Sequence, residues 1–137
     1  MDRGPAEAER RAPPRLVATP RFFLDTYALV EVVRGSPRYR RYLAAELRTS
    51  VWNLVELYLA ILRDRGEDEA QRQFARFRTI AIDPEDGWLF EAMGLKVRRP
   101  KLSYADAIGY TAARRIGARF LTGDEAFRRL PDVEFCR

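Results

Sequence analysis

The 137-residue chain contains no histidine and one cysteine, Cys136, and its only lysines are Lys96 and Lys101. Without histidine it cannot build a Ser-His-Asp or Cys-His nucleophile, a histidine metal site or a paired-histidine site for RNA cleavage. A single cysteine excludes an internal disulfide and a thiolate zinc site. The side chains left for catalysis are carboxylates, and their natural cations are oxygen-preferring ions such as Mg²⁺ and Mn²⁺.

Long apolar runs are also missing from the sequence. No stretch approaches the roughly 20 residues needed to span a bilayer, so we expect no membrane association. Residues 1–15 contain charges and prolines but no apolar stretch, so we expect no secretory signal there. The scarcity of cysteine, together with these absences, predicts a cytoplasmic protein.

The arrangement of apolar segments predicts an α/β domain over residues 21–137, preceded by a flexible proline-containing N-terminal tail over residues 1–20. Strands alternating with helices favour a mainly parallel sheet. The expected strands cover 21–25, 79–82, 118–122 and 133–136, and the expected helices cover 26–34, 36–47, 49–65, 67–78, 83–97, 103–116 and 125–130. Apolar residues surround the helix over 49–65, which predicts a buried helix, and we assign Trp52 and Trp88 to the core.

Four carboxylates stand in apolar stretches where a folded protein normally places carbon: Asp25, Glu56, Asp106 and Asp124. Burying one carboxylate costs several kcal/mol unless a partner compensates its charge. A shared divalent cation supplies that compensation, and it also lowers the pKa of bound water and stabilises charge on a phosphoryl group. The four acids therefore predict metal-dependent hydrolysis of a phosphodiester by an activated water.

Three of these acids also have a purely structural interpretation. Asp25 and Asp124 each precede an expected helix and suit its N-cap. Asp106 stands three residues after Ser103, as in a capping box. Glu56 lies in mid-helix and caps nothing, and Arg63 is two turns away, too far for an ion pair along the helix.

Arginine dominates the basic side of a formal net charge of +5. Guanidinium groups bind phosphate through two parallel hydrogen bonds, although genomic base composition explains arginine-rich usage equally well. The densest basic loop contains Arg98, Arg99 and Lys101, which either contact RNA phosphates or form a solvated loop.

Four segments together resemble the PIN-domain family, in particular the VapC-type toxin ribonucleases of VapBC toxin–antitoxin pairs. They are Phe23-Leu24-Asp25-Thr26, Thr49-Ser50-Val51-Trp52-Asn53-Leu54-Val55-Glu56-Leu57, Leu102-Ser103-Tyr104-Ala105-Asp106-Ala107 and Phe120-Leu121-Thr122-Gly123-Asp124-Glu125-Ala126-Phe127. The resemblance implies a three-layer α/β/α fold with a mainly parallel sheet of about five strands. It further implies a Mg²⁺- or Mn²⁺-dependent endoribonuclease, a cognate antitoxin that occludes the site, and a homodimer.

The same resemblance implies roles for individual residues. Asp25, Glu56, Asp106 and Asp124 match the catalytic, metal-binding quartet. Thr26, Thr122 and Asn53 match polar positions that support these ligands. Many family members have a small residue where this chain has Tyr27, which we expect to be a packed helix residue.

Three other functions compete with a toxin ribonuclease. A PIN-like RNA-processing enzyme would use the same acids on another RNA. A PIN-like RNA- or protein-binding module would have lost its metal, although it would have no reason to keep four costly carboxylates. A haloacid-dehalogenase-like phosphatase would need a second aspartate two residues after Asp25, where Tyr27 stands.

Overall fold

The computed structural model of the protein describes residues 19–137, and residues 1–18 of the predicted tail lie outside this range. Pro20, also assigned to the tail, joins the fold, because its carbonyl accepts a hydrogen bond from the Glu46 amide at 3.0 Å. The strands are β1 (Arg21–Leu24), β2 (Glu46–Ser50), β3 (Ala81–Ile82), β4 (Arg119–Thr122) and β5 (Val133–Phe135). The α-helices are α3 (Thr26–Val33), α4 (Val51–Arg65), α5 (Glu67–Arg78), α6 (Asp86–Arg98) and α7 (Tyr104–Arg115), and the 3₁₀ helices are η1 (Pro37–Tyr42) and η2 (Glu125–Phe127).

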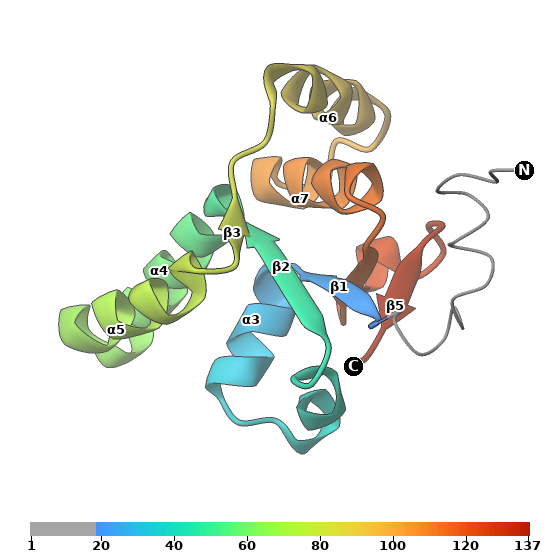
Figure 1. The fold of residues 1–137 in the computed structure, drawn as a ribbon. Coiled ribbons are helices and arrows are strands. Elements are labelled where there is room, and N and C mark those ends of the chain that lie inside the picture. The colour runs from blue at the N-terminus through green and yellow to red at the C-terminus, as the bar shows by residue number, and fades with distance from the viewer. Residues whose placement is uncertain (1–18) are drawn as a thin grey trace, which may run out of the picture.

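The five strands form one parallel sheet in the order β3-β2-β1-β4-β5 (Figure 1). The chain places β2 and β3 on one side of β1, then returns to place β4 and β5 on the other side. The two halves therefore diverge between β1 and β4. In open α/β sheets, the crevice at the carboxyl ends of the strands beside such a switch point is where ligands bind.

Helices cover both faces of this sheet, with α3, α4 and α5 on one side and α6 and α7 on the other (Figure 1). The alternation of side chains along a strand supplies both faces with apolar groups. In β1, Phe23 packs with Phe120 and Tyr110 beneath α7, and Leu24 joins the cluster beneath α3 and α4. The predicted three-layer α/β/α fold with a parallel sheet is confirmed.

Strand β2 was missed by the sequence patterns, which predicted a helix over 36–47. The Ser36-Pro37 start is correct, but only the 3₁₀ helix η1 follows it, and Glu46–Ser50 is a strand. Segment 43–48 consists of residues with good helix propensity. Pairing with β1 on one side and β3 on the other overrides that local preference.

The helix α4 is not buried all round, contrary to the prediction from its apolar circumference. Trp52 is 43% exposed and Val55 is 59% exposed, and Leu59 and Leu62 are exposed with them. Trp52 is therefore not a core residue, whereas Trp88 packs against the core cluster beneath α7. The other face of α4 buries Leu54, Leu57 and Ile61 against the sheet side of the helix layer. The sequence pattern could not separate a buried face from an apolar face left open.

None of the helices within residues 19–137 is long and apolar enough to cross a bilayer.

The segment that follows β5 is held to η1 by a buried hydrogen bond, in which the Tyr39 hydroxyl donates to the Cys136 carbonyl at 2.5 Å. We predict that Tyr39→Phe lowers the free energy of unfolding by about 0.5–1.5 kcal/mol, the usual contribution of such a bond. Urea unfolding measures the change. Tyr104→Phe is the matched control, since Tyr104 is 60% exposed, and should leave stability unchanged. Equal effects of the two substitutions would contradict this role of Tyr39.

Candidate functional site

The two strands that flank the switch point each lead directly into one of the four acids. Asp25 follows β1, and its amide donates to the Leu121 carbonyl of β4 at 3.2 Å. Asp124 follows the end of β4 by two residues. Parallel pairing of Leu24 with Leu121 aligns the carboxyl ends of these strands, so both acids lie at the same edge of the sheet.

Asp25 is the only one of the four acids that is fully buried, at 1% exposed. Its Oδ1 accepts from the Ala28 amide at 2.8 Å and so caps α3, as predicted, and its Oδ2 accepts from Thr122 Oγ1 at 2.5 Å. Burial raises the pKa of Asp25 from 3.8 to about 7, and the charges of Asp106 and Asp124 act in the same direction. The two hydrogen bonds offset only part of the cost of burying this charge.

Glu56 is half-buried on α4 and has a partner on another helix. Thr26 Oγ1 donates to Glu56 Oε1 at 2.8 Å, and Asn53 Nδ2 donates to Thr26 Oγ1 at 3.2 Å. Asn53 is completely buried, and its Oδ1 accepts from Ser50 Oγ at 2.6 Å. Asn53 therefore supports Glu56 through the Thr26 hydroxyl.

Asp106 lies in the first turn of α7 and completes a capping box with Ser103. The Ser103 amide donates to Asp106 Oδ2 at 2.9 Å, and the Asp106 amide donates to Ser103 Oγ at 3.0 Å. Burial raises the pKa of Asp106, and the charges of Glu56 and Asp124 raise it further. The structural interpretation of this acid is correct, and its carboxylate also faces the charges of two other acids.

Asp124 is tied to Asp25 through one threonine. Thr122 Oγ1 donates to Asp25 and accepts from the Asp124 amide at 3.0 Å. Asp124 Oδ1 caps η2 by accepting from the Ala126 amide at 3.0 Å, as predicted. Thr122 therefore fixes both strand-end acids relative to each other.

The arrangement of the acids is more open than a closed set of metal ligands. Within residues 19–137 no three acidic side chains approach closely enough to enclose one cation. Glu56, Asp106 and Asp124 are only half-buried, which corrects the expectation that all four acids are buried. Each of these three has one carboxylate oxygen that accepts no hydrogen bond from the described residues. The donor set is all oxygen and mutually repulsive, so its chemistry fits a hard divalent cation.

Two glycines permit close packing behind the acids. A Cβ on Gly109 of α7 would lie 2.9 Å from Asn53 Oδ1 and 3.0 Å from a Phe23 ring carbon. A Cβ on Gly123 would overlap the ring of Tyr27 and the Cys136 carbonyl. Tyr27 is half-buried against the core, as expected of a packed helix residue, and its ring also braces the turn before Asp124. Neither glycine contact could be identified from the sequence, since each joins distant segments.

The three residues of the predicted basic loop lie in different surroundings in the structure. Arg98 is the last residue of α6, and Lys101 is exposed in the loop that follows. Arg99 instead lines a groove with Arg128 and Arg129, which follow η2. Those two arginines were not singled out in the sequence, although they stand directly after the Asp124 segment.

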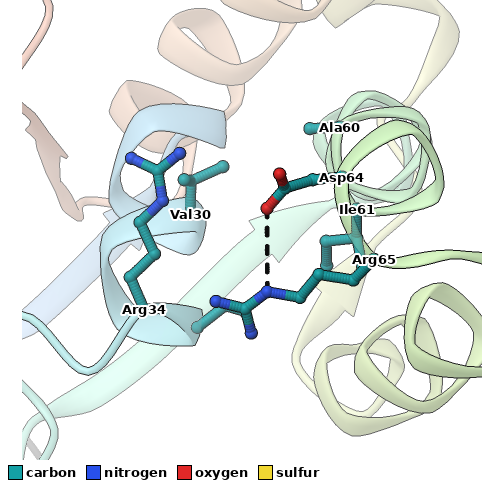
Figure 2. A pocket seen from close by; sticks show the side chains of 7 residues that line it. Val30, Arg34, Ala60, Ile61, Asp64 and Arg65 are labelled. Carbon is teal, nitrogen blue, oxygen red and sulfur yellow. Dashed lines mark ion pairs between the residues drawn. The ribbon is translucent and has the colours of Figure 1, made fainter.

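A second hollow, of about 40 Å³, lies between α3 and α4 and is separate from the acids (Figure 2). Val30 and Ile61 line it from the C-terminal halves of the two helices, whereas Asp25 and Glu56 lie toward their N-terminal ends. Asp64 pairs with Arg65 at its rim at 3.7 Å. Its lining offers no set of carboxylates for the predicted chemistry.

Comparison with known proteins identifies the family of this chain. The family model described as PIN domain matches residues 22–133. The chain belongs to the PIN domain family. This PIN domain matches VapC20 of Mycobacterium tuberculosis, named a Sarcin-Ricin loop cleaving toxin, with 22% identity, a TM-score of 0.68 and coverage of 85% of this chain and 99% of the other.

Two further solved structures share the fold of this PIN domain. VapBC2 from Rickettsia felis, bound to a DNA fragment from its promoter, matches with 18% identity, a TM-score of 0.66 and coverage of 85% and 97%. A toxin-antitoxin complex from Klebsiella pneumoniae matches with 19% identity, a TM-score of 0.65 and coverage of 82% and 94%. No match was found among curated proteins. Membership of the PIN family excludes the haloacid-dehalogenase-like alternative.

The contact between Gly109 and Asn53 gives a prediction. Gly109→Ala should lower the free energy of unfolding by about 1–3 kcal/mol, because the methyl group overlaps Asn53 and Phe23. Gly94→Ala in α6 is the matched control, since its nearest neighbour would be Arg98 Nη1 at 3.6 Å. That substitution should raise stability by up to about 1 kcal/mol through helix propensity. Equal gains measured by urea unfolding would contradict the close packing at Gly109.

The raised pKa of Asp25 gives a second prediction. Without divalent cations, the folded protein holds this proton with a pKa of about 7 and the unfolded chain with a pKa near 3.8. Protonation of Asp25 therefore stabilises the folded state. This contribution is fully present below the pKa of the unfolded chain and is lost as the pH rises through the pKa of the folded protein, by up to about 1.4 kcal/mol per pH unit. Asp25→Asn should flatten this dependence in urea unfolding. Parallel pH profiles of the two proteins would contradict it.

Proposed function

We propose that this PIN domain is a Mg²⁺- or Mn²⁺-dependent endoribonuclease, the toxin of a type II toxin–antitoxin pair acting in the cytoplasm. The observation that supports it most is that the strand ends and helices bring Asp25, Glu56, Asp106 and Asp124 to the switch-point edge of the sheet, where burial, and to a lesser extent the charges of the other acids, raise the pKa of Asp25 and of Asp106. Acids gathered at one edge of the sheet, one of them fully buried, are costly, and a divalent cation removes that cost. The VapC and VapBC names of structures with the same fold support the toxin assignment.

In the proposed mechanism, Asp25, Glu56, Asp106 and Asp124 would hold the cation, which has to draw these side chains closer together than they lie in the structure. When bound, Mg²⁺ or Mn²⁺ supplies an activated water and neutralises charge on the phosphate that is attacked. Thr122 holds Asp25 and Asp124 in place, and Thr26, supported by Asn53, holds Glu56. The protein contributes positioning and electrostatics, and no side chain forms a covalent intermediate.

A cognate antitoxin and a second copy of the chain complete the proposal as partners. Support comes from the apolar residues that α4 leaves exposed, including Trp52 and Val55. Val55 also lines a shallow groove with Tyr58 and Phe74 between α4 and α5. Contiguous exposed apolar surface of this kind marks interaction sites between proteins.

Replacement of one acid tests the enzyme function. Asp25→Asn keeps an oxygen that can cap α3 but removes the charge, so cleavage of total RNA in Mg²⁺ should be lost. The measurement is a digest with end-mapping, which also reveals the cleavage sequence. Asp83→Asn, in the exposed loop before α6, is the matched control and should cleave at the wild-type rate. Cleavage by Asp25→Asn at the wild-type rate would contradict the mechanism.

Metal binding is tested by thermal unfolding. A cation at one hundred times its dissociation constant stabilises the folded state by about 2.7 kcal/mol. Mg²⁺ or Mn²⁺ should therefore raise the Tm, and chelation should lower it again, whereas Asp25→Asn should respond much less. A Tm that does not respond to either cation would favour the binding module that has lost its metal.

A further inference from the structure

A groove lined largely by arginines lies between the α6–α7 loop and the segment that follows η2. We call it the arginine groove, and its lining residues are Arg99, Glu125, Ala126, Arg128, Arg129 and Leu130. All three arginines are exposed. They come from two segments about thirty residues apart in the chain, so the fold, and not a local run of basic residues, creates this surface.

The charge of the arginine groove is only partly compensated. Glu125 is its one acidic residue, and this carboxylate pairs with both Arg128 and Arg137 at 3.0 Å. The Arg128 guanidinium also lies 4.8 Å from the centre of the Phe135 ring, which holds it in place. Arg99 and Arg129 have no acidic partner within residues 19–137, so two guanidinium groups remain available to a ligand.

Each side of the arginine groove is continuous in the chain with one of the four acids, Asp124 on one side and Asp106 on the other. Its η2 side begins at Glu125, the residue after Asp124. On its other side, the Arg99 carbonyl accepts from the Leu102 amide at 3.1 Å, directly before the capping box that holds Asp106. The two segments that form the groove are thus continuous with those that carry Asp124 and Asp106, so a strand bound at these acids can continue along the arginines.

We propose that the arginine groove binds the phosphates of the RNA strand next to the bond that is cleaved. This inference rests on the proposed function, which supplies the RNA. Guanidinium groups suit phosphate because they donate two parallel hydrogen bonds to it. An RNA strand carries one phosphate per nucleotide at regular spacing, so a strand whose cleaved phosphate lies at the acid site can place its neighbouring phosphates on the arginines.

The test measures RNA binding in the Asp25→Asn background, in which cleavage cannot confuse the signal. The probe is a fluorescein-labelled single-stranded RNA of mixed sequence, and anisotropy gives its affinity at several salt concentrations. Each lost phosphate contact lowers the salt slope of the binding constant by about 0.7. Arg99→Ala combined with Arg129→Ala should lower the salt slope by about 1.4. The ratio of the parent affinity to the affinity of this double variant should therefore fall about sevenfold between 50 and 200 mM salt.

The matched control removes the same net charge elsewhere. Arg63→Ala with Arg78→Ala alters exposed arginines on α4 and α5, on the other side of the molecule (Figure 1), and should keep the parent slope. If both double variants lower the salt slope equally, the arginine groove is not a specific site for phosphate. Each single groove variant is measured as well and should lower the salt slope by about 0.7. These single variants still test the groove if the double variant does not fold.

Failure of this inference can be told apart from failure of the proposed function. If wild-type protein cleaves RNA in Mg²⁺ but the groove variants bind RNA like the parent, only the arginine groove is wrong. If the wild-type protein neither cleaves nor binds RNA, the proposed function is wrong and the groove has no such ligand. Binding of polyglutamate that is lost in the groove variants, with RNA binding unchanged, would assign the groove to an acidic polypeptide instead.

Discussion

The burial of one carboxylate, that of Asp25, is the constraint on which the rest of the site depends. This side chain joins three elements: it ends β1, caps α3 through Ala28, and accepts from Thr122 of β4. Because Thr122 also holds the Asp124 amide, the position of one acid determines the position of another. A protein selected only for stability would place an apolar residue at such a point, since burying the charge costs several kcal/mol. The proposed cation gives this costly arrangement a purpose.

Much of this architecture could be predicted from the sequence. The strands that end before Asp25 and Asp124, and the helices that carry Glu56 and Asp106, follow from apolar runs bounded by capping residues and glycines. Strand β2 could not be predicted, because its residues favour a helix and only its two neighbouring strands make it extended. The burial of α4 was also misjudged, since apolar residues around a helix do not reveal which face lacks a neighbour.

The candidate site likewise combines contacts within one short segment, which the sequence predicts, with contacts between distant segments, which it does not. The caps formed by Asp25, Asp106 and Asp124 are local, and the sequence patterns predicted all three. The bond from Thr26 to Glu56, and the support of Thr26 by Asn53, depend on α3 packing against α4. Glu56, for which no partner along its helix could be found, proves to be held by a residue thirty positions away. Contacts of this kind carry no periodic signal in a single sequence.

We propose that the four acids are kept because a divalent cation binds among them. The most direct measurement is the anomalous scattering of Mn²⁺ in a crystal grown with that ion. We expect a peak at the switch-point edge of the sheet, with oxygen atoms of Asp25 and at least one other of the four acids as ligands. A crystal that holds Mn²⁺ elsewhere on the chain, with these acids paired only to protein groups and water, would contradict it.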